Sequence, residues 1–447
     1  MLEKILSGVS KNKKLISDAF DYLWANPEVG YKEWKADAYL KEKYKKLGYE
    51  LTEAGNIPGF TALIDTGRPG PTVVVFGEMD ALFCSAHPMA DPDTGAAHAC
   101  GHCAQSASLL GIAAALKEPG ALDDMSGRIL LAAVPAEELI DTEFRKDLAE
   151  KGIIKYFGGK QEFIYRGLLD KADMAIMIHS SAGIGKDAGK ITKGSNGFML
   201  KNVVFHGVAA HAGGAPHKGK NAFYAANNAI SAIKALRETF RDDDHIRVHG
   251  IITSGGDSVN AIPDRVSLEY YVRGATKDAI VDANRKINRA LAGAAVSMGC
   301  TVTIEDRQGY LPRVYDPEMM LVAKEAMELT LGETHYMPEN WGAGCSDFGD
   351  ITALMPGVHP FIGGSHGAAH GKDFGFEEPA DVCENSSKAQ LAMLWLLLKD
   401  GAARAKHITE NFKPSFESKE DYLKFLDDNT EIKEAVTYND DGSALVK

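Results

Sequence analysis

Short apolar segments alternate with helical segments along much of the chain, and this alternation constrains the fold most. The strand-like segments are rich in β-branched and apolar residues, and they lie at 60–65, 72–76, 128–134 and 173–178. The first two are separated by the turn residues 66–70, which predicts a strand pair. A helix of small residues is expected at 104–117. Alternating strands and helices predict an α/β domain around a mainly parallel sheet, in which functional side chains follow the carboxyl ends of strands.

Between residues 195 and 305 the pattern changes to strand, helix, two strands, helix and strand. The predicted segments are 198–205, 221–240, 247–254, 265–272, 278–298 and 301–305. This order is that of a ferredoxin-like βαββαβ module. Strand and helix segments then resume at 318–331, 359–362 and 385–400. We therefore predict a discontinuous first domain at 1–194 and 306–447, interrupted by a second domain at 195–305, with 401–447 as a peripheral tail.

The charge and the cysteine content exclude several classes of protein. Among 447 residues there are 49 Lys and Arg against 62 Asp and Glu, which gives a net charge of −13. Nucleic acids and anionic membranes usually require a cationic surface, so neither is expected as a partner. The apolar segment 389–398 is too short to span a bilayer, and the first residues lack the apolar core of a secretory signal. Six cysteines in so long a chain do not indicate a disulfide framework, and we expect a cytoplasmic protein.

A cysteine and a histidine two residues apart, Cys100 and His102, lie just before the predicted helix 104–117. A thiolate and an imidazole at this spacing can bind one metal ion. Two alternatives remain open for the motif alone. Cys100 and Cys103 can be inert buried thiols, or they can form a redox pair, because they have Cys-x-x-Cys spacing.

Two adjacent acids, Glu137 and Glu138, follow the predicted strand 128–134. One such carboxylate can bind a metal ion while its neighbour takes a proton from metal-bound water. The same pair can also stabilise the N-terminus of a helix. His179 and His370 follow two further apolar segments. Together these segments supply nitrogen, oxygen and sulfur ligands that suit one or two zinc, manganese or cobalt ions, namely Cys100, His102, Glu138, His179 and His370.

The segments HACGH, PAEE, IHSS, VAAHAGGAPHKGKNA, SVNAIPD and AAHGKDF occur in this order. They resemble the aminoacylase and carboxypeptidase family of metal-dependent peptidases (clan MH), in the branch of hippurate hydrolase, auxin-conjugate hydrolases and aminobenzoyl-glutamate hydrolase. The resemblance covers about residues 15–400. The segments GEMDAL and SDFGD also resemble the aminobenzoyl-glutamate and β-alanyl-dipeptide subgroup. The resemblance implies an enzyme with two divalent metal ions that hydrolyses an amide bond.

The resemblance also implies how the metal ligands are shared. Cys100 would take the bridging place between two ions, where other branches use an aspartate. His102 and Glu138 would bind one ion, and His179 and His370 would complete the cluster. The implied substrate is an acylated amino acid or a dipeptide.

Other residues match positions near the reacting groups. Glu137 matches the general base, and Asp80 matches an acid that orients a ligand imidazole. The module at 195–305 resembles a lid that also forms a homodimer, and its His211 matches a histidine that stabilises the oxyanion in the partner subunit. The lid residues that match substrate-binding positions are Asn260, Arg273, His217 and Asn221.

The chain departs from the family pattern at two places. Cys103 and Gln105 follow the CGH motif where Asp or Asn, often followed by Ala-His, is usual. An insertion after GEMDAL contains His87, Asp91 and Asp93, which could supply an extra ligand.

The favoured hypothesis is a metal-dependent amidohydrolase of N-acyl or N-aroyl amino acids, similar to aminobenzoyl-glutamate. The alternatives are a β-alanyl-type dipeptidase, a catalytically silent family member that binds a peptide-like ligand, and a thiol-redox protein.

Overall fold

The computed structural model describes residues 2–447 and divides into two compact units. The first unit contains the described residues up to Gly194, Val314–Gly342 and Ser346–Phe416. The second unit contains Ser195–Arg313, Ala343–Cys345 and Glu417–Lys447. None of the helices within the described residues combines the length and the apolar character that a bilayer crossing requires.

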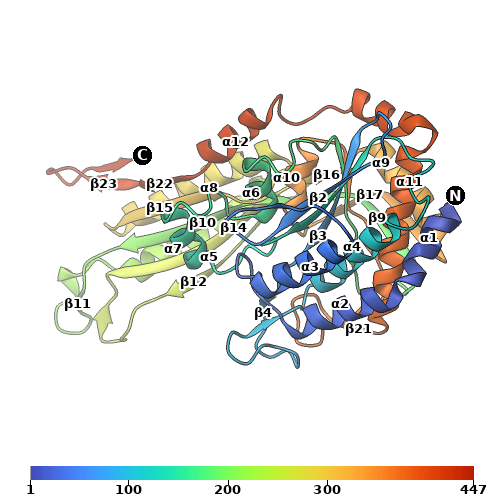
Figure 1. Cartoon of the computed structure of the whole chain (residues 1–447). Helices are drawn as coiled ribbons and strands as arrows, with labels where there is room; N and C mark the ends of the chain where they lie inside the picture. Colours follow the sequence, from blue (N-terminus) through green and yellow to red (C-terminus); the bar gives the residue numbers. More distant parts are fainter. Residues whose placement is uncertain (1) are drawn as a thin grey trace. The chain divides into compact units, whose positions relative to one another are not determined.

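A six-stranded mixed sheet forms the centre of the first unit (Figure 1). Its strands follow the order β1 (Thr52–Glu53), β2 (Phe60–Asp65), β6 (Arg128–Val134), β3 (Thr72–Glu78), β7 (Met174–Ile176) and β18 (Gly357–Val358). The four strands from β6 to β18 run parallel to one another, whereas β2 runs antiparallel to both of its neighbours. β3 is buried on both faces, which explains its nearly continuous apolar sequence.

The predicted pairing of the first two long strands is wrong. β6 lies between β2 and β3, so that Ala133 pairs with Phe60 on one side and with Gly77 on the other. The turn residues 66–70 therefore connect strands that are not neighbours. A turn sequence fixes the local reversal of the chain, but the apolar strand β6 gains more burial in the middle of the sheet than at its edge.

Helices pack around this sheet. α4 (His102–Leu116) is buried along its whole length and contacts β3, α1 (Leu2–Lys11), α2 (Lys13–Ala25) and α11 (Pro379–Asn411). Its Ala- and Ser-rich sequence allows these close contacts. The N-terminal region forms three helices instead of the two expected, because the chain breaks between α1 and α2 before α3 (Trp34–Lys46) begins. α11 extends past residue 400 and is interrupted by non-helical backbone at residues 399–402.

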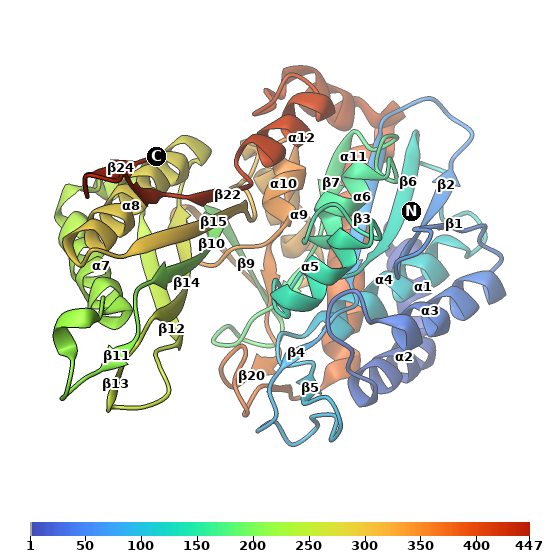
Figure 2. The same cartoon turned by 90° about the vertical axis from the view of Figure 1, so that its left-hand side faces the viewer.

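The second unit contains a five-stranded antiparallel sheet (Figure 2). Its order is β12 (Arg247–Ser254), β14 (Arg265–Gly274), β10 (Gly197–His206), β15 (Thr301–Gln308) and β22 (Glu431–Glu434). α7 (Ala222–Leu236) and α8 (Lys277–Ser297) pack on one face and bury an apolar core. In chain order the first four strands and two helices run β10, α7, β12, β14, α8, β15.

The C-terminal residues differ from the expected peripheral tail of the first domain. β22 pairs antiparallel with β15, and residues 417–447 belong to the second unit. Ala435 and Val436, which follow β22, are buried in the core of that unit. An unpaired edge of β15 would leave backbone groups without partners, and β22 supplies them.

Candidate metal centre

The five predicted ligands come from four chain segments of the first unit, and the structure brings all of them together. Two groups have ligand atoms within 4.8 Å of one another. The first group is Cys100, His102 and His179, and the second is Cys100, Glu138 and His370. Cys100 belongs to both groups, as a bridging ligand must. The grouping differs from the expected one, since His102 lies with His179 and Glu138 lies with His370.

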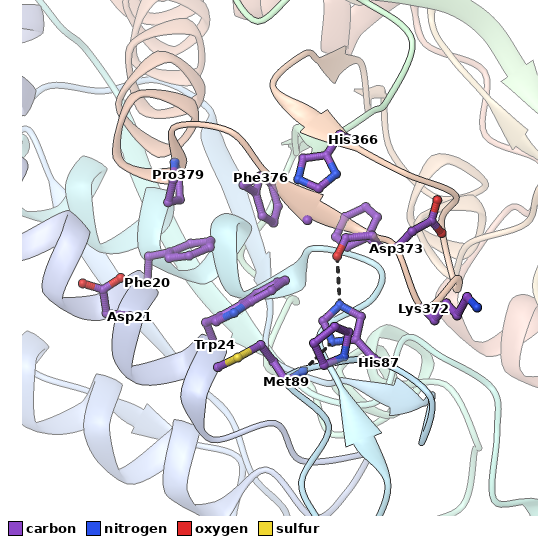
Figure 3. A pocket seen from close by; sticks show the side chains of 13 residues that line it. Phe20, Asp21, Trp24, His87, Met89, His366, Lys372, Asp373, Phe376 and Pro379 are labelled. Carbon is purple, nitrogen blue, oxygen red and sulfur yellow. Dashed lines mark hydrogen bonds between the residues drawn. The ribbon is translucent and has the colours of Figure 1, made fainter.

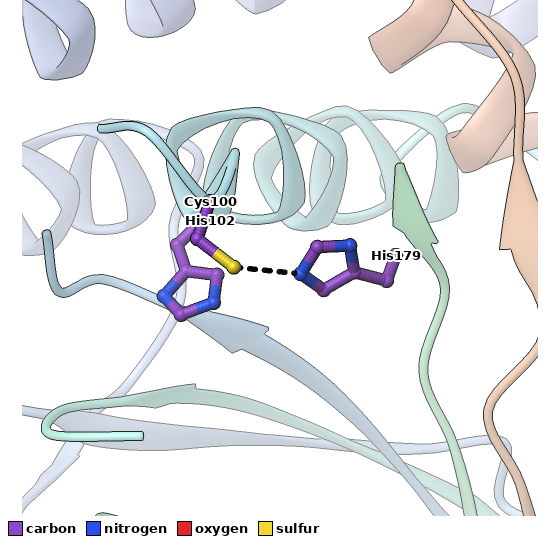
Figure 4. Close-up of side chains that lie close together, drawn as sticks. All are labelled: Cys100, His102 and His179. Carbon is purple, nitrogen blue, oxygen red and sulfur yellow. Dashed lines mark hydrogen bonds between the residues drawn. The ribbon is translucent and has the colours of Figure 1, made fainter. Parts of the chain in front are cut away.

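Local structure explains how the first group forms. Gly101 has a φ of +91° and immediately precedes α4, so that Cys100 and His102 both face the same space. A Cβ atom at Gly101 would lie 2.7 Å from the Ser180 hydroxyl, so no larger residue fits without displacement. His179 begins the short strand β8 (His179–Ser180). Its Nε2 lies 3.4 Å from the Cys100 sulfur (Figure 4).

Hydrogen bonds fix the tautomers of both histidines in this group. Nδ1 of His102 lies 2.9 Å from the Asp80 carboxylate and 3.1 Å from the Asp80 carbonyl oxygen. Nδ1 of His179 lies 2.6 Å from the Ser180 carbonyl oxygen. A carbonyl oxygen can only accept, so each Nδ1 carries the proton and each Nε2 keeps its lone pair. Nε2 of His102 is buried and forms no hydrogen bond among the described residues, as expected for a metal ligand.

The second group contains a buried acid and a more exposed histidine. Nε2 of His370 lies 3.1 Å from a carboxylate oxygen of Glu138. The backbone N–H of Glu138 donates to Asp80 at 2.8 Å. Asp80 is fully buried and therefore contacts both groups, one through the His102 ring and the other through the Glu138 backbone. This position agrees with the predicted orienting acid.

Glu137 lies at the edge of the first group. Its carboxylate is 3.9 Å from Nε2 of His102 and only 8% of the residue is exposed. Burial, followed by the charges of Glu78 and Glu138, raises the pKa of Glu137 well above its usual range. A glutamate with a raised pKa beside the ligand cluster can exchange a proton with a bound water.

Sequence reasoning missed a buried ionic network below His102. Glu78 lies 3.2 Å from Nε2 of His102, and it pairs with Lys160 at 2.5 Å. Lys160 also pairs with Asp347 at 2.6 Å, and all three side chains of the network are almost inaccessible to solvent. Burial alone would raise the pKa of Glu78, but Lys160 and the imidazoles of His102 and His179 lower it to about 2. Lys160 and Asp347 are 187 positions apart, so no spacing pattern could connect them.

The two departures from the family pattern do not remove ligands from the cluster. Gln105 donates to the Glu78 carboxylate at 2.8 Å, and Cys103 is fully buried. In the insertion, Nε2 of His87 lies 2.8 Å from the Phe374 carbonyl oxygen and Nδ1 accepts the N–H of Met89 (Figure 3). His87 lines a cavity of about 450 Å³ with aromatic walls. Neither it nor the insertion's aspartates join the ligand groups found among the described residues.

The predicted substrate-binding residues lie in the second unit. His211 pairs in register with Ala261, next to Asn260, and its Nδ1 accepts the N–H groups of Gly213 and Gly214. Asn221 caps α7, since its side chain accepts the N–H groups at 223 and 224. Arg273 lies 3.4 Å from the Ala343 carbonyl oxygen and 3.5 Å from the Cys345 sulfur. His217 is exposed in a short 3₁₀ turn, Pro216–Lys218.

Comparison with protein families gives one match over most of the chain. A model described as peptidase family M20/M25/M40 matches residues 74–394. A Bacillus subtilis dinuclear metal binding peptidase of known structure is 20% identical with a TM-score of 0.65, covering 87% of this chain and 99% of that one. This likeness concerns the fold.

Three curated relatives are similar in sequence. Indole-3-acetyl-aspartic acid hydrolase of Enterobacter agglomerans is 32% identical over 56% of this chain and 55% of its own length. One of the subunits of p-aminobenzoyl-glutamate hydrolase from Escherichia coli (strain K12) is 31% identical over 56% and 55%. Xaa-Arg dipeptidase of Homo sapiens is 27% identical over 88% and 87%. The chain thus matches about half the length of the first two relatives.

Proposed function

Because the chain belongs to peptidase family M20/M25/M40, we propose that this metal-dependent amidohydrolase cleaves the amide bond of N-acyl or N-aroyl amino acids. The observation that carries the proposal is the pair of ligand groups that share Cys100, with Glu137 beside them. The alternative of a dipeptidase has its own support, because the similarity to the human Xaa-Arg dipeptidase covers nearly the whole chain.

The donor set fits two divalent ions of the zinc, manganese or cobalt type. The residues that would hold them are Cys100, His102, His179, Glu138 and His370. Divalent ions bound there would supply a water molecule of lowered pKa and positive charge for a developing oxyanion. Asp80 would keep the His102 ring and the Glu138 backbone in place.

Glu137 would perform the proton transfers. Its carboxylate would accept the proton of the attacking water and then give it to the leaving amine. Its burial keeps bulk water from competing for the proton.

The second unit would act as the lid and homodimerisation domain, formed mainly by residues 195–305. The strand and helix order of this unit, and the exposed edge strand β12 with Ile251 and Ile252 on it, support this proposal. Nδ1 of His211 accepts two N–H groups, which leaves the proton on Nε2. His211 can therefore donate a hydrogen bond to an oxyanion, and Asn260 and Arg273 would hold the substrate carboxylate.

A substrate panel with defined metal content tests the proposal. Protein stripped with a chelator is reloaded with zinc, manganese or cobalt and given N-acetyl, N-benzoyl and aminobenzoyl amino acids beside β-alanyl dipeptides. We expect amino acid release from the acylated or aroylated compounds only after reloading. Release from the dipeptides alone would establish the alternative. A reloaded protein that cleaves nothing would show a silent binding protein.

A further inference from the structure

Glu137 and Glu138 are consecutive residues, yet both carboxylates reach the ligand cluster. Glu137 lies 3.9 Å from His102, and Glu138 lies 3.1 Å from His370. Consecutive side chains of an extended strand point in opposite directions, so the chain must turn after β6 ends at Val134. Ala136 makes this turn with a φ of +58°, a left-handed conformation that residues other than glycine rarely adopt.

Two buried charged side chains hold this turn from outside the cluster. The carboxylate of Glu33 accepts the N–H of Ala136 at 2.8 Å. The guanidinium of Arg145 donates to the carbonyl oxygen of Glu138 and, at 3.5 Å, to that of Ala136. Glu33 and Arg145 are both fully buried. The backbone of the turn is therefore fixed on both sides by side chains that belong to neither ligand group.

The surrounding chain makes room for these contacts. A Cβ atom at Gly30 would lie 2.5 Å from the Arg145 guanidinium and 2.9 Å from the Cα atom of Ala136. The ring of Tyr31 lies 5.5 Å from the same guanidinium. Arg145 is also anchored at its other side, where it donates to the Phe157 carbonyl oxygen at 2.5 Å. Packing at Gly30 thus leaves Arg145 one position, directly against the turn.

We propose that Arg145, assisted by Glu33, is a positioning residue that holds the left-handed turn at Ala136, so that Glu137 and Glu138 face one metal cluster. The inference rests on the proposed function, in which Glu138 binds an ion and Glu137 transfers protons. Without the guanidinium the turn relaxes toward an extended backbone, which rotates one carboxylate away from the cluster. A displacement of this size affects the chemical step more than substrate binding.

The test compares Arg145→Met with Arg166→Met. Arg166 is a matched control, because its guanidinium also donates to backbone carbonyls, those of Ala54 and Ile153, but does not touch the turn. Metal-free proteins are titrated with Co²⁺ by calorimetry, and kcat, KM and Tm are measured after loading. For Arg145→Met we expect Co²⁺ affinity to fall about tenfold. We expect kcat to fall about 100-fold with KM nearly unchanged. Arg166→Met should change Tm alone.

A second substitution separates positioning from general loss of stability. Glycine adopts positive φ without strain, so adding Ala136→Gly to Arg145→Met should restore at least part of the lost Co²⁺ affinity and kcat. Equal Co²⁺ affinities of the Arg145 and Arg166 variants would overturn the proposal. If Arg145→Met does not fold, Arg145→Lys keeps the charge and allows the same comparison. If wild-type protein binds Co²⁺ but cleaves no substrate, the proposed function fails, while the affinities still decide the positioning role.

Discussion

At the scale of single residues, two carbonyl oxygens decide which nitrogen of the ligand histidines can bind an ion. The carbonyl groups of Asp80 and Ser180 accept from Nδ1 of His102 and His179, and this leaves Nε2 of each ring for the cluster. The ionic network below has a related effect. Glu78 and Asp347 share the single positive charge of Lys160, so the network contributes one net negative charge beneath a cationic centre when both acids are ionised.

Glu137 provides the most direct test at this scale. Glu137→Gln keeps the shape of the side chain but removes its ability to accept a proton. We expect kcat to fall by roughly a thousandfold, within the usual contribution of a general base, with the metal content unchanged. Activity and bound metal are measured on the same samples. The metal content should persist because Glu137 belongs to neither of the groups that share Cys100.

The control for this variant is Glu118→Gln, at a residue that pairs with Lys11 on the surface. It should leave both readings at the wild-type level. A Glu137→Gln protein with near-native turnover would exclude Glu137 as the base.

At the scale of elements, the start of α7 illustrates how one residue type fits two hypotheses. The resemblance places Asn221 in substrate binding, whereas in the structure its side-chain oxygen accepts two N–H groups of the first turn. An N-cap needs such an oxygen because the first N–H groups of a helix have no partner within it.

The cap leads to a prediction about stability. Asn221→Ala should lower the free energy of unfolding by about 1 kcal/mol, whereas Asn221→Asp, which also accepts these hydrogen bonds, should not. Urea unfolding followed by circular dichroism measures both variants, and KM is measured in parallel. An alanine variant with unchanged stability and a strongly raised KM would instead favour the substrate-binding hypothesis.

The strand β22 shows why the end of the chain was mispredicted. Its sequence, Glu-Ile-Lys-Glu, is short and charged, and charged residues are typical of edge strands as well as of loops. Its pairing with β15 joins residues more than 120 positions apart in the sequence. Only the unsatisfied edge of β15 distinguishes this segment from a solvated tail, and that edge exists only after the sheet has formed.

At the scale of the whole molecule, every predicted metal ligand lies in the first unit. Ions that bind only the folded state stabilise it in proportion to the logarithm of their concentration. Removing them with a chelator should therefore lower the stability of the first unit by about 3 kcal/mol, relative to ions at 100 times their Kd. Hydrogen exchange should show lost protection in α4 and β6 but not in α7 and α8.

Reloading with zinc provides the control, and it should restore protection in α4 and β6. An equal loss of protection in both units on chelation would contradict an ion site confined to the first unit.

Local residue patterns were enough to identify the family, the α/β class and the limits of several elements. The strands at 60–65 and 128–134 have the predicted bounds, because alternating or continuous apolar residues are a local property. The ligand residue types were readable for the same reason, since Cys100 and His102 are two positions apart and Glu137 and Glu138 directly follow a strand.

Which distant residues meet depended on the packing of the whole chain. That packing placed β6 between β2 and β3, grouped His102 with His179, and brought Lys160 to Glu78 and Asp347. It also brought Glu33 to the N–H of Ala136, 103 positions away. Buried charges must find partners wherever the packed chain offers them, and the sequence distance between such partners follows no period.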